Sequence, residues 1–183
     1  MTPLGMPNPR RFTASRRARG FTLIEVLVVL VIVGVVTATL MLAAGGSGAR
    51  ELENAAQRSR GLIALACERA VLTGRDLGFA PTRTGLRFGY FQAEGWRPLG
   101  DEGNDELRAR PWGAGVEVQA QREGEPMELP DGAPAQADFA CFSSGELTPF
   151  RFDFRRADVA EVWTLQGALD GSVTLTTRDD DAP

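Results

Sequence analysis

The pattern of hydrophobic and polar positions divides the chain into an apolar run, an amphipathic segment and a region of short alternating stretches. The apolar run covers residues 21–44 and contains one charged side chain, Glu25. A helix of this length would measure about 36 Å, which is enough to cross a bilayer core of about 30 Å. We therefore predict a transmembrane helix over residues 21–44.

A buried core helix and a secretory signal peptide are the alternative interpretations of this run. A core helix is usually shorter and polar on one face, whereas this run is apolar on all faces. A signal peptide would carry an apolar region of about 7 to 15 residues before a small-residue cleavage site. Ala43-Ala44-Gly45 could serve as such a site, but the length of the run and its glutamate favour a membrane anchor.

The amphipathic segment follows a glycine-rich stretch, residues 45–48, which we interpret as a hinge because glycine weakens helices. Small and apolar residues then recur at three- and four-residue spacing over residues 49–74. They are Leu52, Ala55, Ala56, Ser59, Leu62, Ile63, Ala66, Cys67 and Ala70. This spacing predicts a helix with one apolar face that packs on a globular domain, with Gly74 as its C-cap.

Residues 75–183 show the alternation of β-strands. In Phe150-Arg151-Phe152-Asp153-Phe154 the alternation places the three aromatic side chains on one face. The segment from Glu94 to Arg110 is rich in Gly, Pro and acidic residues, and we predict a loop there. The predicted strands are Leu77–Ala80, Gly85–Phe91, Val116–Gln121, Phe139–Ser143, Phe150–Phe154, Glu161–Leu165 and Ser172–Thr176. One helix against several antiparallel strands predicts an α+β domain.

Charge is distributed unevenly along the chain. Five arginines and no acid precede Phe21, whereas the rest carries 15 arginines against 24 acidic residues, a balance of −9. The positive-inside rule then predicts a cytoplasmic N-terminus and an external globular domain. Residues 101–183 hold 18 acids and 7 arginines, and this balance of −11 argues against nucleic acid as a partner.

The composition also limits the chemistry of the chain. With no histidine, neither a Ser-His-Asp nor a Cys-His catalytic pair can form, and imidazole metal sites are excluded. The serines Ser143 and Ser144 therefore lack a base. We predict no enzyme activity, no small-molecule substrate, no cofactor and no metal site. We interpret Asp179-Asp180-Asp181 as a solvated tail, because consecutive acids without a defined loop offer poor calcium geometry.

An ionised carboxylate inside hydrocarbon costs several kcal/mol, so Glu25 requires a cation at the same depth. No Arg or Lys lies between Phe21 and Ala49. A free α-amino group would appear at this depth if the chain were cut between Gly20 and Phe21. A small residue such as Gly20 also suits the scissile bond of a protease. These residues predict processing at Gly20–Phe21.

The stretch Arg19-Gly20-Phe21-Thr22-Leu23-Ile24-Glu25-Val26 resembles the cleavage and methylation motif of type IV prepilins and type II secretion pseudopilins. The resemblance implies that residues 1–20 are a basic leader removed by a prepilin peptidase of the inner membrane. It also implies N-methylation of Phe21. Glu25 would then neutralise the amine of Phe21 in a neighbouring subunit when subunits assemble. The implied fold is pilin-like, a long N-terminal helix packed on an antiparallel β-rich domain.

Downstream strings resemble the minor pseudopilin H family of type II secretion. They are Gly89-Tyr90-Phe91, Trp96-Arg97-Pro98-Leu99 and Phe142-Ser143-Ser144-Gly145-Glu146-Leu147-Thr148-Pro149-Phe150. The resemblance implies a structural subunit near the tip of the pseudopilus, anchored in the inner membrane with a periplasmic domain and contacting minor and major pseudopilins. A minor type IV pilin, in pilus assembly or DNA uptake, and a membrane-anchored periplasmic enzyme are the alternatives. The secreted substrates and the order of subunits at the tip are not determined by the sequence.

The two cysteines leave two alternatives open. Cys67 lies on the apolar face of the amphipathic segment and Cys141 in a predicted strand. In a periplasmic domain disulfides persist, so the two residues either form a disulfide or remain two buried thiols.

Overall fold

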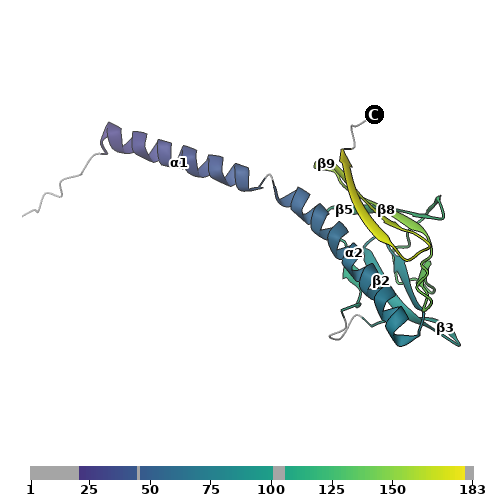
Figure 1. Ribbon diagram of the computed structural model, residues 1–183. Coiled ribbons are helices and arrows are strands. Elements are labelled where there is room, and N and C mark those ends of the chain that lie inside the picture. The colour runs from purple at the N-terminus through teal and green to yellow at the C-terminus, as the bar shows by residue number, and fades with distance from the viewer. Residues whose placement is uncertain (1–20, 45, 101–105, 180–183) are drawn as a thin grey trace, which may run out of the picture. The chain divides into compact units, whose positions relative to one another are not determined.

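The structure, a computed structural model, describes residues 21–44, 46–100 and 106–179. The predicted leader, Gly20, Gly45 of the predicted hinge, and Asp180 and Asp181 of the predicted tail lie outside the described residues. The chain divides into two compact units, Met1–Ala43 and Ala44–Pro183. We call them the anchor unit and the globular unit and describe each by itself (Figure 1).

The anchor unit is described by helix α1, Leu23–Ala44. Thr22 caps its first turn, because the Thr22 hydroxyl oxygen accepts a hydrogen bond from the Glu25 backbone N–H at 3.3 Å. Thr39, inside the apolar run, donates its hydroxyl to the Val36 carbonyl at 2.8 Å, so its polar group is satisfied within the helix. This helix can therefore present an apolar surface without an unpaired hydroxyl at this position.

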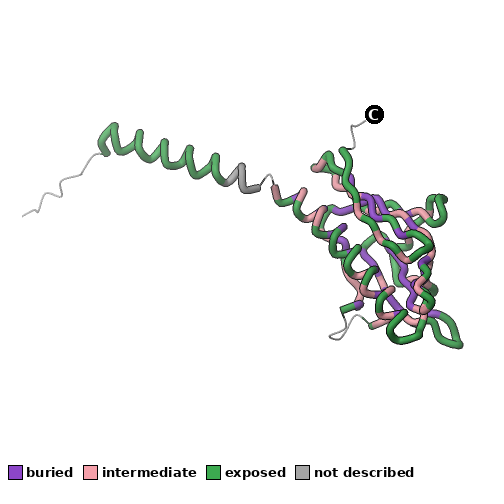
Figure 2. Tube along the Cα trace, viewed as in Figure 1, coloured by how far each residue is buried: buried purple, intermediate pink, exposed green. Residues whose placement is uncertain are grey.

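The described side chains of α1 are exposed within the anchor unit. Residues 21–39 are exposed (Figure 2), and the Phe21 and Leu23 side chains are 79% and 83% exposed. Within the described residues, no helix combines the length and mean hydropathy needed to cross a membrane. The transmembrane span that we predicted over residues 21–44 is thus not found in this part of the chain and stays a prediction.

Helix α2, Ser47–Thr73, starts the globular unit and includes Ser47 and Gly48, which the sequence analysis placed in the hinge. Its buried face is Gly48, Leu52, Ala55, Ala56, Ser59, Ile63, Ala66 and Ala70, close to the face predicted from the spacing. Gly74 has φ +63, and this left-handed conformation ends the helix. The predicted C-cap is confirmed.

Two antiparallel sheets complete the globular unit. The first has the order β3-β2-β1-β7, with β4 also paired to β2, and the second has the order β10-β9-β8-β5-β6. The strands of the first sheet are β1 Leu77–Pro81, β2 Gly85–Gln92, β3 Gly95–Pro98, β4 Arg110–Pro111 and β7 Phe139–Cys141. Those of the second are β5 Val116–Arg122, β6 Glu125–Met127, β8 Phe150–Arg156, β9 Val159–Gly167 and β10 Val173–Asp179. The predicted α+β class is confirmed.

Each predicted strand overlaps an observed one, but the loop predicted from Glu94 to Arg110 is wrong at both ends. Gly95–Pro98 forms β3, whose residue Trp96 pairs with Phe91 of β2. Arg110–Pro111 forms β4, which pairs with Gly85 and Leu86. Both strands are short and contain proline, and they exist because β2 offers them a ladder of backbone partners. The short strand β6 was also missed.

Phenylalanine rings join the two sheets. Phe139 of the first sheet lies 5.6 Å from Phe150 and 5.5 Å from Phe152 of the second, measured between ring centroids. Phe79 stacks on Phe139 at 5.2 Å. The three aromatic side chains of β8 predicted to share a face are all buried in this core with the apolar face of α2. The core therefore holds together α2 and both sheets.

Candidate assembly site

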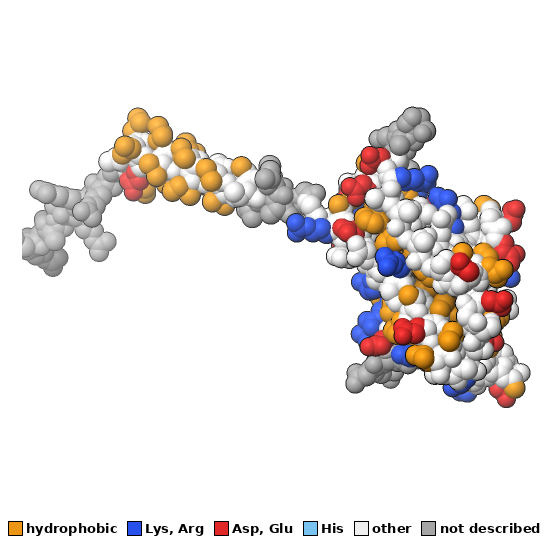
Figure 3. All heavy atoms as spheres, in the orientation of Figure 1, with side chains coloured by type: hydrophobic (Ala, Val, Ile, Leu, Met, Phe, Trp, Pro, Cys, Tyr) orange, Lys and Arg blue, Asp and Glu red, His pale blue; other side chains and the backbone are white. Residues whose placement is uncertain are grey.

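The structure places Phe21 and Glu25 on exposed positions at the start of α1. Glu25 has no ion pair within its described unit, and the described arginine nearest to it in sequence is Arg50. Figure 3 shows hydrophobic side chains along the described part of α1 and an acidic group at its start. The Glu25 carboxylate and the apolar side chains of residues 21–39 are thus exposed within the anchor unit.

Cys67 of α2 and Cys141 of β7 are joined by a disulfide, with their Cα atoms 4.8 Å apart and a separation of 74 positions along the chain. Cys141 is fully buried and Cys67 is partly buried. The bond connects the helix to the first sheet. Because the two cysteines lie far apart along the chain, the sequence could not decide whether they form a disulfide.

An ionic clamp, formed by Arg156, Asp158 and Glu51, lies beside the first turns of α2. The Arg156 Nε donates to Asp158 at 2.5 Å, and its terminal nitrogen lies 3.6 Å from Glu51. The same guanidinium donates to the Ala114 carbonyl, while Glu51 accepts from the Ala114 N–H at 3.1 Å. Gly48 leaves room for the clamp, because a Cβ there would lie 2.8 Å from the Asp158 carboxylate. Sequence reasoning missed the clamp, since Glu51 lies 105 positions before Arg156 in the chain.

The clamp predicts a pH dependence of stability. The hydrogen bond from Arg156 lowers the pKa of Asp158 below its ordinary value. A lowered pKa in the folded state stabilises the protein above the unfolded pKa, and this contribution is lost as the pH falls through the folded pKa. We expect Asp158→Asn to unfold at lower urea concentration than wild type near pH 7. The difference between the two urea midpoints should disappear below about pH 4, the ordinary range of the aspartate pKa.

Urea titrations of the mature protein at several pH values would measure this difference. Asp131→Asn is a matched control, because Asp131 pairs with Arg83 at 3.3 Å on a highly exposed surface where ion pairs contribute little. The prediction would be contradicted if the urea midpoints of wild type and Asp158→Asn differed by the same amount at all pH values.

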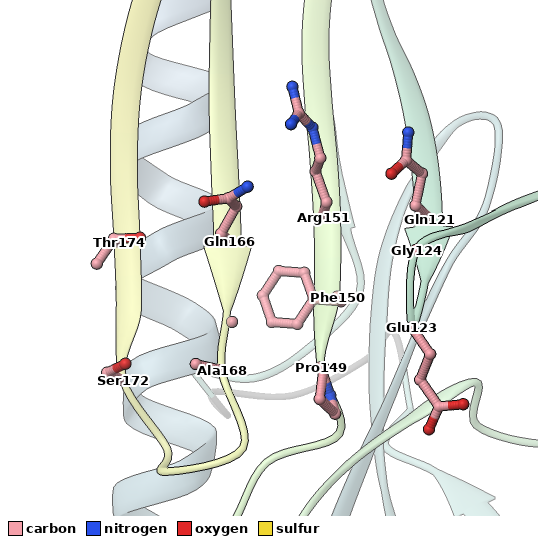
Figure 4. A pocket seen from close by; sticks show the side chains of 11 residues that line it. Gln121, Glu123, Gly124, Pro149, Phe150, Arg151, Gln166, Ala168, Ser172 and Thr174 are labelled. Carbon is pink, nitrogen blue, oxygen red and sulfur yellow. The ribbon is translucent and has the colours of Figure 1, made fainter.

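The outer face of the second sheet is polar. Thr174, Gln166, Arg151 and Gln121 lie in register across β10, β9, β8 and β5, with α2 behind the sheet (Figure 4). They line a shallow pocket of about 560 Å³. Its lining residues include one acid, Glu123, and no nucleophile with an adjacent base. The polar side chains of this pocket can form hydrogen bonds, but they do not form a recognisable catalytic site.

Asp153, on the same outer face, is buried among its partners. It accepts hydrogen bonds from the Thr164 hydroxyl at 2.6 Å and from the Arg151 Nε at 3.1 Å. Arg178 approaches it at 3.9 Å. Because these donors compensate the carboxylate, Asp153 is a structural residue of the sheet. The described residues contain no group of three or more His, Cys, Asp or Glu side chains that could hold a metal ion.

The exposed large hydrophobic side chains of the described globular unit gather at one end. They are Val71, Leu72, Phe91, Phe142 and Leu169, and we call them the apolar end. Hydrogen bonds connect their segments around the C-terminal end of α2. Asp76 accepts from the Ser143 N–H at 2.7 Å and from the Phe91 N–H at 3.3 Å, and the Leu147 N–H donates to Leu169 at 3.2 Å. Sequence reasoning missed this surface because these residues come from four separate segments.

Comparisons with known proteins agree with this architecture. Residues 15–41 match the prokaryotic N-terminal methylation motif. Type II secretion system protein H of Pseudomonas aeruginosa is 34% identical over 148 residues, which cover 74% of this chain and 82% of that protein. The minor pseudopilin EpsH of Vibrio cholerae is 22% identical and superposes with a TM-score of 0.57 over 72% of this chain and 99% of that chain. The solution structure of E. coli GspH is 21% identical, with a TM-score of 0.57 over 75% of this chain and 96% of that chain.

The methylation motif, the helix and the two-sheet unit define a pilin-like protein. The sequence identity to the Pseudomonas aeruginosa protein identifies the family more specifically. The chain belongs to the type II secretion system protein H family.

Proposed function

We propose that the mature chain is a non-enzymatic minor subunit of the type II secretion pseudopilus, which assembles near the tip and helps to export folded proteins. The observation that carries the proposal is α1, an apolar helix in a unit of its own whose residues from 23 to 39 are exposed. An apolar helix of this kind is stable where membrane lipid or the helices of other subunits surround it. Relatives named type II secretion proteins favour a secretion system over a pilus.

Processing is the first step of the proposal. A prepilin peptidase of the inner membrane cuts between Gly20 and Phe21 and methylates the new amine, as the methylation motif over residues 15–41 suggests. The leader stays in the cytoplasm with its five arginines, and the globular unit lies in the periplasm. Cleavage creates the cation that Glu25 otherwise lacks. Glu25 then pairs with the Phe21 amine of a neighbouring subunit. The two charges compensate each other only when the two anchor helices have the axial offset that brings these groups together.

The apolar end is proposed to contact a neighbouring subunit of a different type. The anchor connects to α2 at Ser47, and the 27 residues of α2 separate that point from the apolar end by about 40 Å. The membrane that holds the anchor is therefore a poor partner for the apolar end. Two copies joined end to end through this surface would place the first residues of their α2 helices, to which the anchors attach, at opposite ends of the pair. This is incompatible with insertion of both anchors into one membrane from one side. A non-identical subunit with an apolar patch remains as the partner.

Processing and assembly can be tested together. The chain, produced with prepilin peptidase and the other pseudopilins, should have a mass corresponding to N-methylated Phe21 and should co-purify with them. Gly20→Leu should accumulate as the uncut form, because the scissile bond needs a small residue, whereas Gly20→Ala should be cut more readily. Intact-mass analysis of membrane extracts measures both. A mature N-terminus at another residue, or no recovery with pseudopilins, would overturn the proposal.

A further inference from the structure

The C-terminal end of α2 buries less apolar side chain than the first part of the helix, with Leu65 and Cys67 only partly buried against the core. From Ala64 to Thr73 the only fully buried side chains of the helix are Ala66 and Ala70, which bury a methyl group each, whereas the first part of the helix buries Leu52 and Ile63. Because burial energy scales with apolar area, the last two or three turns gain much less from packing than the first turns. The disulfide from Cys67 to Cys141 lies within this weakly packed part.

The partner strand of the disulfide is short and lies at a sheet edge, although the core buries its three residues. Strand β7 has three residues, Phe139–Cys141, and lies at the edge of its sheet, where β1 is its strand neighbour. The chain leaves β7 through Phe142 into the turn that Asp76 holds by its bond to the Ser143 N–H. One covalent bond thus connects the last turns of α2 to the segment that carries Phe142. Both parts belong to the apolar end.

We propose that the Cys67–Cys141 disulfide is a redox-dependent switch that completes the apolar end, so that only an oxidised subunit is incorporated into the pseudopilus. The inference rests on the proposed function, in which the apolar end contacts a neighbouring subunit. In the reduced chain the core holds the sheets and the first turns of α2 together, while the last turns fray and displace Val71 and Leu72. Because the disulfide forms in the periplasm, the subunit becomes able to assemble only after its globular unit has reached that compartment.

The chemistry needs an oxidant, and a periplasmic dithiol oxidase of the thioredoxin-like class supplies it. Cys67 is partly exposed, so its thiolate attacks the disulfide of the oxidase, forms a mixed disulfide and releases one oxidase thiolate. The Cys141 thiolate then attacks the Cys67 sulfur and releases the second. Two protons and two electrons pass from the two cysteines to the oxidase, which leaves as the dithiol. Because Cys141 is fully buried in the folded unit, this exchange occurs before the end of α2 packs against β7.

Hydrogen exchange and co-purification test the switch in the full-length chain. The double variant Cys67→Ser/Cys141→Ser, produced with prepilin peptidase and the other pseudopilins, should still be cut at Phe21. Amides of residues 67–73 should exchange about tenfold faster or more than in wild type, with a smaller change over residues 52–63. Recovery with the other pseudopilins should fall by a similar factor. Wild type from a host without the oxidase should behave like the variant, and cystine in the medium should restore it.

Val116→Ala separates this switch from a general loss of stability. Val116 is buried and pairs with Arg156, at the end of the unit that holds the ionic clamp. We expect Val116→Ala to lower the global stability of the protein, while the variant is still incorporated into the pseudopilus as well as wild type. Equal incorporation of the double serine variant and wild type would overturn the switch, as would equal loss in Val116→Ala. Failure of oxidised wild type to co-purify would instead overturn the proposed function, and this inference with it.

Discussion

Glu25→Leu is expected to leave the protein cut and inserted in the membrane but to reduce its recovery with the other pseudopilins about tenfold or more. The methylated Phe21 amine of a neighbouring subunit would then have no carboxylate partner among packed apolar helices. An unpaired charge there costs about 2.5 to 3.5 kcal/mol, and each 1.4 kcal/mol corresponds to about a factor of ten in an equilibrium constant. The start of α1 should persist, because Thr22 accepts its hydrogen bond from the backbone N–H of Glu25 and not from the side chain.

Two readouts measure this effect in the same cells. Intact mass reports the cut, and crosslinking or co-purification with the neighbouring pseudopilins reports incorporation. Glu25→Gln is the matched control, since it removes the charge but keeps the size and hydrogen-bonding groups, and it should show a loss close to that of Glu25→Leu. Normal incorporation of both variants would show that the ion pair is dispensable and that contacts of the globular unit position the subunit.

Phe139→Ala is expected to destabilise the globular unit by about 3 to 5 kcal/mol, the range for removing a large buried aromatic side chain. The Phe139 ring contacts Phe79 within its own sheet and Phe150 and Phe152 of the other sheet. Its removal leaves a cavity where the two sheets meet. Since domains are typically stable by about 5 to 15 kcal/mol, this loss is a large part of the total.

Urea unfolding of the mature protein would show this loss as a lower midpoint with an unchanged slope. Phe142→Ala is the control, because Phe142 lies three residues further along the chain but is 37% exposed. It should change the stability much less while weakening the contact with a neighbouring subunit. Similar losses of stability in the two variants would contradict the description of Phe139 as the residue that joins the sheets.

The local pattern determined the elements that lie in continuous segments. The amphipathic spacing from Leu52 to Ala70 and the Gly74 cap predicted α2, and the alternation in residues 150–154 predicted the buried face of β8. Helix and strand periodicity reflect the backbone geometry of a single segment, which neighbouring residues suffice to specify. The motif around Gly20, Phe21 and Glu25 identified the class of protein for a similar reason, because it is a continuous segment of the chain.

The tertiary structure alone decided which distant residues meet. Strands β3 and β4 contain proline and have weak strand signals, and they form because β2 lies beside them. The pairing of Cys67 with Cys141, the clamp of Arg156 with Glu51 and the gathering of Leu72, Phe142 and Leu169 at one end each join segments far apart in the chain. Such contacts depend on how α2 and the two sheets pack around the phenylalanine core. The sequence determined which residues could form each element, and packing decided which of their side chains became neighbours.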